Sequence, residues 1–376
     1  MRKGGKMKVK IERTLLLKEL DLMNGIVEKR STMPILNYIL LKSKEGGKIE
    51  ISGTDLEIGI VIEINAEIER DGSITVAFSL LYNLIKEMET EYIEIEEKED
   101  SVVELRGGNS FYTLYGLSPD NFPTIPLPEN EEKVIIDIKI FKKLIKMIKY
   151  AISEEHYTAM GGGYFIFKGK TIEAVSSDYN RLAYVKTEVG ENFGEIDFLI
   201  YRKALNEILK FEDEGKIEVI KGVNNYFFVY GNRILTSRVI EKKFPEFYDY
   251  VNMEREKKVI FYREETNKAL RRILNIISSK IKQVNMVIKE DKIILSYDSV
   301  DSGRGEEELR AEGYKGDDII ISFNAIFIKE FLENIESEKV IMEFSDEKTI
   351  VRFKPEDGVK EGDQKFDYTY MVIPFQ

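Results

Sequence analysis

The sequence has no cysteine and no tryptophan, and its only histidine is His156. A chain without cysteine forms no disulfides, no thiolate metal sites and no cysteine nucleophile. A zinc site needs several nitrogen or sulfur ligands, so one histidine argues against zinc, and we predict no metal and no cofactor. A Ser-His-Asp triad would depend on His156 alone. We interpret this histidine as a solvated loop residue.

Long apolar runs are also missing, since none approaches the roughly 18 residues of a membrane span. The basic start, MRKGGK, is not followed by the apolar segment of a secretory signal. We therefore expect a cytoplasmic protein with no membrane partner. With 376 residues, 43% of them hydrophobic, the chain is long enough for two or three globular domains.

Positive charge is in deficit, with 56 basic against 68 acidic residues and a net charge of −12. Taken as a whole, this balance argues against non-specific nucleic-acid binding. The acids, however, concentrate in strands and loops such as 94–100, 128–132, 210–215 and 305–312. The bases concentrate on the expected helices, which predicts one positive surface on an acidic protein.

The expected helix at 134–150 shows this separation. Phe141, Leu144 and Ile148 belong to an apolar stripe at helical spacing that should face a core. Lys142, Lys146 and Lys149 share the opposite face, while Lys268, Arg271 and Arg272 repeat the pattern later in the chain. Such bases without interleaved aromatic residues favour contacts with phosphates rather than with bases, although a lysine-rich face is also typical of plain solvated surface.

Several unrelated features recur about every 122 residues. Phe122-Pro123 returns as Phe244-Pro245. An acid-bearing turn recurs at Asp55, Asp178 and Asp298, and a strand leads into a helix at Phe78, Tyr201 and Phe323. These repeats predict three homologous domains, at 7–128, 134–253 and 257–376. Each domain reads as an α+β unit with two helices on antiparallel sheet.

At this point the chain resembles the bacterial sliding clamp, the beta subunit of DNA polymerase III. The resemblance rests on a set of short motifs that occur in the family's order: Arg30-Ser-Thr-Met-Pro34-Ile-Leu, Gly53-Thr-Asp55, Ser177-Asp178-Tyr-Asn-Arg181-Leu182-Ala183, Phe323-Asn324 and the ending Tyr370-Met-Val-Ile-Pro374. The resemblance implies a head-to-tail homodimeric ring of three-domain subunits with helices lining the hole. Such a ring encircles duplex DNA without sequence specificity, tethers the polymerase and catalyses nothing.

The resemblance also implies functional positions. A hydrophobic cleft between domains two and three would accept a short motif from replicative and repair polymerases, the clamp loader and other partners, and it would comprise Tyr179, Asn180, Arg181, Leu182, Pro245, Asn324, Phe327, Met371, Ile373 and Pro374. The residues expected to face DNA are Arg30, Arg202 and Lys203 by position, and Lys142, Lys146, Lys149, Arg271 and Arg272 by charge pattern. The dimer contact would join Tyr112 and Leu114 to Asn275, Ile276 and Ile277.

Comparison of the first two repeats separates the roles of Asp178 and Arg181. Asp55 matches Asp178, whereas Ile58 stands where Arg181 stands. Asp178 is therefore predicted to cap a repeated turn. Arg181, found in one repeat only, would contribute to the rim of the cleft or form a local salt bridge to Asp178.

Two other functions remain open from the residues alone. Asp55, Glu57 and Asp178 could be metal-binding carboxylates of a nuclease, but equivalent positions in successive domains should lie a whole domain apart. A repeat scaffold that binds only proteins is the other alternative.

Overall fold

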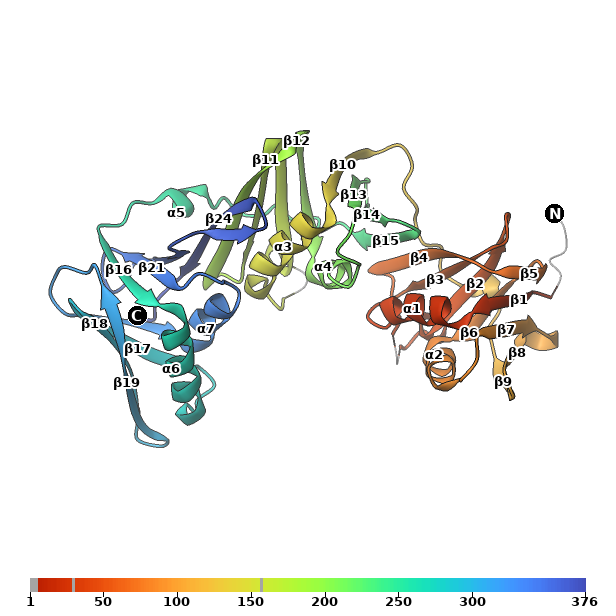
Figure 1. Cartoon of the computed structure of the whole chain (residues 1–376), viewed down its shortest axis with the longest axis horizontal. Helices are drawn as coiled ribbons and strands as arrows, with labels where there is room; N and C mark the ends of the chain where they lie inside the picture. Colours follow the sequence, from red (N-terminus) through yellow and green to blue (C-terminus); the bar gives the residue numbers. More distant parts are fainter. Residues whose placement is uncertain (1–5, 29–30, 156–157) are drawn as a thin grey trace. The chain divides into compact units, whose positions relative to one another are not determined.

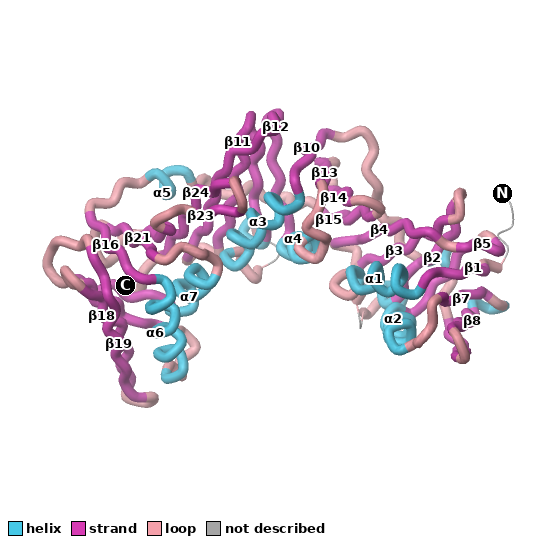
Figure 2. Tube along the Cα trace, viewed as in Figure 1, coloured by secondary structure: helices cyan, strands magenta, loops and turns pink. Residues whose placement is uncertain are grey.

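The computed structural model describes residues 6–28, 31–155 and 158–376. The chain forms two compact units: the first comprises residues 1–140 and 203–239, and the second comprises residues 141–202 and 240–376 (Figure 1). Strands prevail over helices in both (Figure 2). All the strand pairs are antiparallel in the described part of the chain, which confirms the α+β prediction. The predicted domain limits at 7–128, 134–253 and 257–376 stay a prediction.

In its described residues, the first unit contains a five-stranded and an eight-stranded sheet. The order in the smaller sheet is β5 (Glu67–Arg70), β1 (Lys8–Glu12), β7 (Tyr92–Glu97), β8 (Val102–Gly107) and β9 (Ser110–Tyr115). The order in the larger sheet is β10 (Glu132–Asp137), β13 (Lys216–Lys221), β14 (Asn225–Tyr230), β15 (Arg233–Arg238), β4 (Ile58–Asn65), β3 (Lys48–Thr54), β2 (Tyr38–Lys44) and β6 (Ser73–Ala77). Strands of the first two repeats therefore share one sheet.

The second unit is organised around one path of strands. Its order is β11 (Gly162–Ser177), β12 (Arg181–Tyr201), β24 (Gln364–Val372), β22 (Val351–Pro355), β21 (Lys339–Phe344), β16 (Lys257–Tyr262), β19 (Gly303–Glu312), β18 (Lys292–Ser299), β17 (Gln283–Ile288) and β20 (Ile319–Asn324), with β23 (Val359–Glu361) beside β24. Here the path joins repeat two to repeat three.

The same kind of strand pairing across a repeat boundary, called a joint from here on, occurs twice among the described residues. In the first unit β15 pairs with β4, with Leu235 opposite Ile60. In the second unit β24 pairs with β12, with Met371 opposite Leu182. In each case the last strand of one repeat adds to a middle strand of the preceding repeat, so that main-chain hydrogen bonds run across the repeat boundary.

Each repeat contributes two principal helices, as predicted. They are α1 (Arg13–Met23) and α2 (Phe78–Glu87), α3 (Ile138–Ile148) and α4 (Arg202–Ile208), and α6 (Arg263–Ile276) and α7 (Ala325–Glu333), with a short α5 (Tyr248–Asn252) besides. Short 3-10 helices occupy Pro34–Asn37, Glu99–Ser101, Pro119–Asn121, Lys149–Ala151 and Ala159–Gly161. None of the helices in the described residues is both long and apolar enough to cross a membrane.

The third copy of the acid-bearing turn departs from the prediction. Asp298 lies within β18, opposite Arg304 of β19, instead of capping a turn. Asp55 and Asp178 do cap their turns. The β18–β19 hairpin extends its pairing through this region, so the carboxylate remains a strand side chain.

A buried ion network lies at the β15–β4 joint. Helix α1 buries Leu16, Leu20 and Met23 at helical spacing, and Glu19 lies among them with a side chain only 3% exposed. Arg233 of β15 donates Nε and Nη2 to the two Glu19 oxygens, at 2.7 Å each. Arg233 also pairs with Glu212, and this hydrogen bond lowers the pKa of Glu212 to about 2.

The first prediction concerns this network. Arg233→Met should lower the free energy of unfolding by about 3–5 kcal/mol, because the buried Glu19 carboxylate would lose its charge partner. The double variant Glu19→Met with Arg233→Met should lose much less, since it leaves no buried charge at that position. Urea denaturation followed by circular dichroism measures both. Equal losses in the two variants would contradict the buried-charge explanation.

Candidate functional site

The turn at 177–181 is held by its own polar side chains. Asp178 Oδ1 accepts the backbone N–H groups of Asn180 and Arg181, at 3.0 and 3.1 Å. Ser177 Oγ accepts the N–H of Tyr179 at 3.1 Å and donates to the carbonyl of Arg181 at 2.7 Å. Asp178 therefore caps the turn, as the repeat comparison indicated.

Arg181 is occupied inside the protein. Its Nε donates to Asp178 Oδ2 at 2.8 Å, its Nη2 donates to the carbonyl of Tyr150 at 2.6 Å, and its Nη1 pairs with Glu330 of α7. The guanidinium also lies 4.3 Å from the ring centroid of Phe327. The side chain is only 9% exposed. Arg181 thus forms the predicted local salt bridge and has few donors left for a ligand at the rim.

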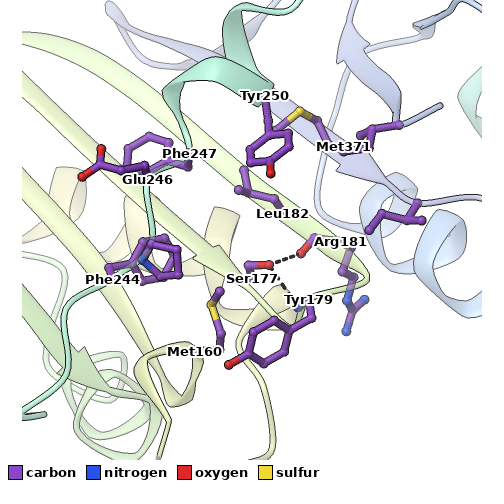
Figure 3. A pocket seen from close by; sticks show the side chains of 13 residues that line it. Met160, Ser177, Tyr179, Arg181, Leu182, Phe244, Glu246, Phe247, Tyr250 and Met371 are labelled. Atoms are coloured by element: carbon purple, nitrogen blue, oxygen red, sulfur yellow. Dashed lines mark hydrogen bonds between the residues drawn. The ribbon is translucent and has the colours of Figure 1, made fainter.

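A cavity of about 330 Å³ opens beside this turn (Figure 3). Its lining is mainly apolar and consists of Met160, Ser177, Tyr179, Arg181, Leu182, Phe244, Pro245, Glu246, Phe247, Tyr250, Ile350, Met371 and Ile373. Repeats two and three both contribute, and all these residues belong to the second unit. Apolar walls of this size are typical of small ligand or peptide sites.

Six of the ten positions predicted for a cleft line this cavity: Tyr179, Arg181, Leu182, Pro245, Met371 and Ile373. The other four lie outside its lining. Asn180 accepts the N–H of Ile373 on its carbonyl at 2.9 Å, and Asn324 caps α7 through the N–H of Ile326. Phe327 lies beneath Arg181, and Pro374 is buried.

The segment 244–250 forms one wall of the cavity, and sequence reasoning predicted only Pro245 of this wall. Phe244 and Phe247 are buried there, and Tyr250 is 47% exposed. Tyr248 ties α5 to β11 by donating to Glu173 at 2.8 Å. The repeated Phe-Pro pair was the only signal for this wall, because the other aromatic side chains are placed by tertiary packing.

Three of the basic residues predicted to face DNA gather in the second unit. Burial lowers the pKa of Lys149, and the nearby charges of Arg202 and Lys146 lower it further. The surroundings of Lys149 are therefore positively charged, and such surroundings favour an anion. Lys146 is exposed, whereas Lys149 and Arg202 are half-buried.

Lys142 differs from its prediction, because it is only 6% exposed. The flanking Phe141 and Leu144 are fully buried. Helix α3 is thus covered over more of its circumference than a single apolar stripe requires. Lys142 does not belong to a solvated lysine face.

The remaining bases predicted for DNA contact have varied surroundings. Arg271 pairs with Glu333 at 2.7 Å, and Arg272 pairs with Glu307 at 2.6 Å. Lys203 pairs with Asp55. Exposed pairs such as those of Arg271 and Arg272 are weak, so a phosphate could replace the carboxylate. Arg30 lies outside the described residues, as does His156.

The residues predicted for a dimer contact divide between surface and core. Tyr112 and Asn275 are exposed, Ile276 is half-buried, and Leu114 and Ile277 are buried within their own units. Tyr112 and Leu114 lie on β9, which is the edge strand of its sheet among the described residues.

The nuclease alternative finds no support in the geometry. Within residues 6–28, 31–155 and 158–376, no three acidic or histidine side chains converge as a metal site would require. Asp55 is paired with Lys203, and Asp178 is paired with Arg181.

Comparison with known families covers nearly the whole chain. The descriptions that match are DNA polymerase III beta subunit, N-terminal domain at residues 7–126, central domain at 135–246, and C-terminal domain at 252–371. The beta sliding clamp of Caulobacter vibrioides is 27% identical over 366 residues, which cover 94% of this chain and 98% of that protein. That of Halalkalibacterium halodurans is 25% identical and covers 89% and 92%.

Solved structures agree. The sliding clamp of Pseudomonas aeruginosa bound to griselimycin is 25% identical, with a TM-score of 0.89 over 99% of this chain and 100% of that one. The sliding clamp of Bacillus subtilis is 21% identical, with a TM-score of 0.90 over 99% and 100%. Neither a nuclease nor a scaffold without a role on DNA is favoured. The chain belongs to the DNA polymerase III beta subunit family, the sliding clamps that serve bacterial DNA replication as non-catalytic processivity subunits.

Proposed function

We propose that two copies of this chain close head to tail into a ring that encircles duplex DNA at the chromosome. The cleft beside Leu182 and Met371 would tether the polymerase, the clamp loader and repair proteins. One observation carries the ring: in the described part of the chain the same strand joint occurs twice, and two further strand edges that correspond to its two halves have no partner.

The two strand edges without a partner are identified by comparing equivalent strands in the three repeats. Strands β4, β12 and β19 begin at Ile58, Arg181 and Gly303, and they occupy equivalent places in repeats one, two and three. The first two receive β15 and β24. Strand β19 pairs with β18 along residues 303–310, and its other edge carries no partner there among the described residues. Strand β9, the counterpart of β15, is also an edge strand.

Joining β9 of one copy to β19 of the other follows from these two free edges. Such a contact is heterologous, and two of them close a dimeric ring. The β15–β4 register, carried over to the equivalent positions, places Leu114 opposite Gly303 and Tyr112 opposite Gly305. A side chain at Gly305 would meet Ile276, so Tyr112 would pack against Ile276 of α6. The proposed contact therefore shifts from Asn275–Ile277 alone to β19 with Ile276 behind it.

The second prediction tests this register. The same carry-over places Thr113 opposite Arg304, and both side chains are exposed. A chain carrying Thr113→Cys and Arg304→Cys should oxidise to a covalent dimer, because the sequence contains no other cysteine. Non-reducing gel electrophoresis measures it. A ladder of higher oligomers would indicate an open filament and contradict the ring.

The matched control carries Thr113→Cys and Glu306→Cys. Glu306 lies two residues farther along β19 and is also exposed. This pair should cross-link poorly, because it is out of register by two residues. Equal yields for the two pairs would contradict the proposed register.

Contact with DNA would come from the cluster of Lys146, Lys149 and Arg202. Its cations would touch the phosphate backbone without reading the sequence. Retention would come from the closed ring, so individual contacts can be weak and the ring can slide. The net charge of −12 does not oppose this, since the positive charge is gathered in one place.

The third prediction concerns this cluster. Lys146→Glu with Lys149→Glu should lower loader-dependent retention on nicked circular DNA by roughly tenfold, because two attractive phosphate contacts become repulsive. Gel filtration of clamp and DNA measures retention. Lys168→Glu with Lys170→Glu, an equal charge change at exposed positions of β11, should have little effect. Equal losses for both variants would point to net charge alone.

The cleft would take an extended peptide whose bulky apolar side chains enter the cavity. Leu182, Met371 and Ile373 offer apolar contacts, and recognition through a few buried apolar anchors is typical of short linear motifs. Arg181 would support the turn from within instead of contacting the peptide.

The fourth prediction uses Ile373, which is 44% exposed and lines the cleft. Ile373→Asp should reduce clamp-dependent primer extension by roughly tenfold, since it places a charge in an apolar binding surface. Light scattering should show an unchanged dimer. The control Ile320→Asp alters another exposed isoleucine, 56% exposed on β20, and should leave extension unchanged. Full extension by Ile373→Asp would contradict the cleft assignment.

A further inference from the structure

Tyr179 has a backbone conformation that a residue with a large side chain rarely adopts. Its φ is +73°, in the left-handed region that favours glycine. In the described ranges of the chain, only Leu56 and Ser101 share this feature among non-glycine residues. Such strain persists where the surrounding structure enforces it, and it often marks a functional position.

Leu56 occupies the equivalent place in repeat one, with a φ of +77°. Its turn is held in the same way. Asp55 Oδ1 accepts two backbone N–H groups at 2.9 and 2.8 Å, and Thr54 Oγ1 accepts the N–H of Leu56 at 2.9 Å. Thr54 also donates to the carbonyl of Ile58, as Ser177 donates to that of Arg181. The strained conformation is therefore a property of the repeated turn.

The two strained residues differ in what their side chains meet. Tyr179 lines the cleft, where Figure 3 shows it beside Met160 at the opposite side from Tyr250. Tyr179 is 58% exposed. Its backbone N–H donates to Ser177 Oγ, and no hydrogen bond of its hydroxyl occurs within the described residues. Leu56 belongs to the first unit and does not line this cleft.

We propose that Tyr179 is a specificity-determining residue of the cleft, whose ring packs against an aromatic side chain of the partner peptide. This inference rests on the proposed tethering function. The capped turn fixes the direction of the Cβ, so the side chain projects from a fixed backbone position at the cleft, whose lining includes Tyr179. A rigid aromatic side chain positioned in this way loses little freedom on binding, and aromatic pairs contribute beyond the area that they bury.

The apolar surroundings support an aromatic occupant at this end. Met160 and Phe244 are buried in one core cluster, so the cleft floor beside Tyr179 is apolar. Leu182, Tyr250 and Met371 remain available for a second apolar side chain of the peptide. The ring, and not the hydroxyl, is the recognition element, because the hydroxyl forms no hydrogen bond with the described residues of the protein.

The fifth prediction concerns the contribution of the Tyr179 ring to peptide binding. It uses two fluorescein-labelled hexapeptides, one with adjacent Leu and Phe and one with Ala in place of Phe. Fluorescence anisotropy should show that Tyr179→Gly binds the Leu-Phe peptide about fivefold more weakly than the full unmodified chain does. The Ala peptide should change less than about twofold, since its partner for the ring is missing. Tyr179→Phe should bind both peptides as the unmodified chain does.

Leu56→Gly is the matched control, because it relieves the same backbone strain in the same turn outside the cleft. It should leave peptide binding unchanged. Equal weakening by Leu56→Gly and Tyr179→Gly would overturn the proposal, as would full binding of the Leu-Phe peptide by Tyr179→Gly. If the unmodified chain binds neither peptide, the tethering function fails as well. If Ile373→Asp abolishes binding and Tyr179→Gly does not, only the role of Tyr179 fails.

Discussion

Antiparallel pairing between strands of different repeats is the interaction on which the rest of the structure depends. The β15–β4 and β24–β12 pairs turn three small α+β repeats into continuous sheets. Each pair satisfies backbone groups that would otherwise form an exposed strand edge, which is a liability in an isolated domain. The cleft exists because of this pairing: β24 brings Met371 beside Leu182, and the chain after β24 brings Ile373 to the turn at Asn180.

A buried arginine forms an ion pair at each joint within the chain, although the strand that carries it and the helix that it reaches differ. Arg233 reaches Glu19 at the first joint, and Arg181 reaches Glu330 at the second. By repeat position, the proposed joint between subunits has Ser110 and Gly303 in their places. That joint would therefore lack an arginine at both of these places. A ring with two reinforced joints per chain and an unreinforced joint between chains is suited to opening between its subunits.

The fold also determines where basic side chains come together. Helix α3, the 3-10 helix Lys149–Ala151 that follows it and the start of α4 bring Lys146, Lys149 and Arg202 close enough to shift the pKa of Lys149, although the chain as a whole is acidic. Some acids are paired with a nearby base, as Glu96 and Glu104 are with Lys98. Clustered cations can form a local positive region on a protein whose net charge is negative.

The sequence by itself determined the fold class, the threefold repeat, the two helices of each repeat and the capping role of Asp178. These features depend on local hydrogen bonds and on periodic burial, which the chain encodes within a few residues. Only the tertiary structure decided that Lys142 is buried and that Arg181 binds Glu330 and the carbonyl of Tyr150. It also decided that Phe247 and Tyr250 line the cleft. Those outcomes depend on which distant strand a segment pairs with, and neither residue type nor spacing specifies that partner.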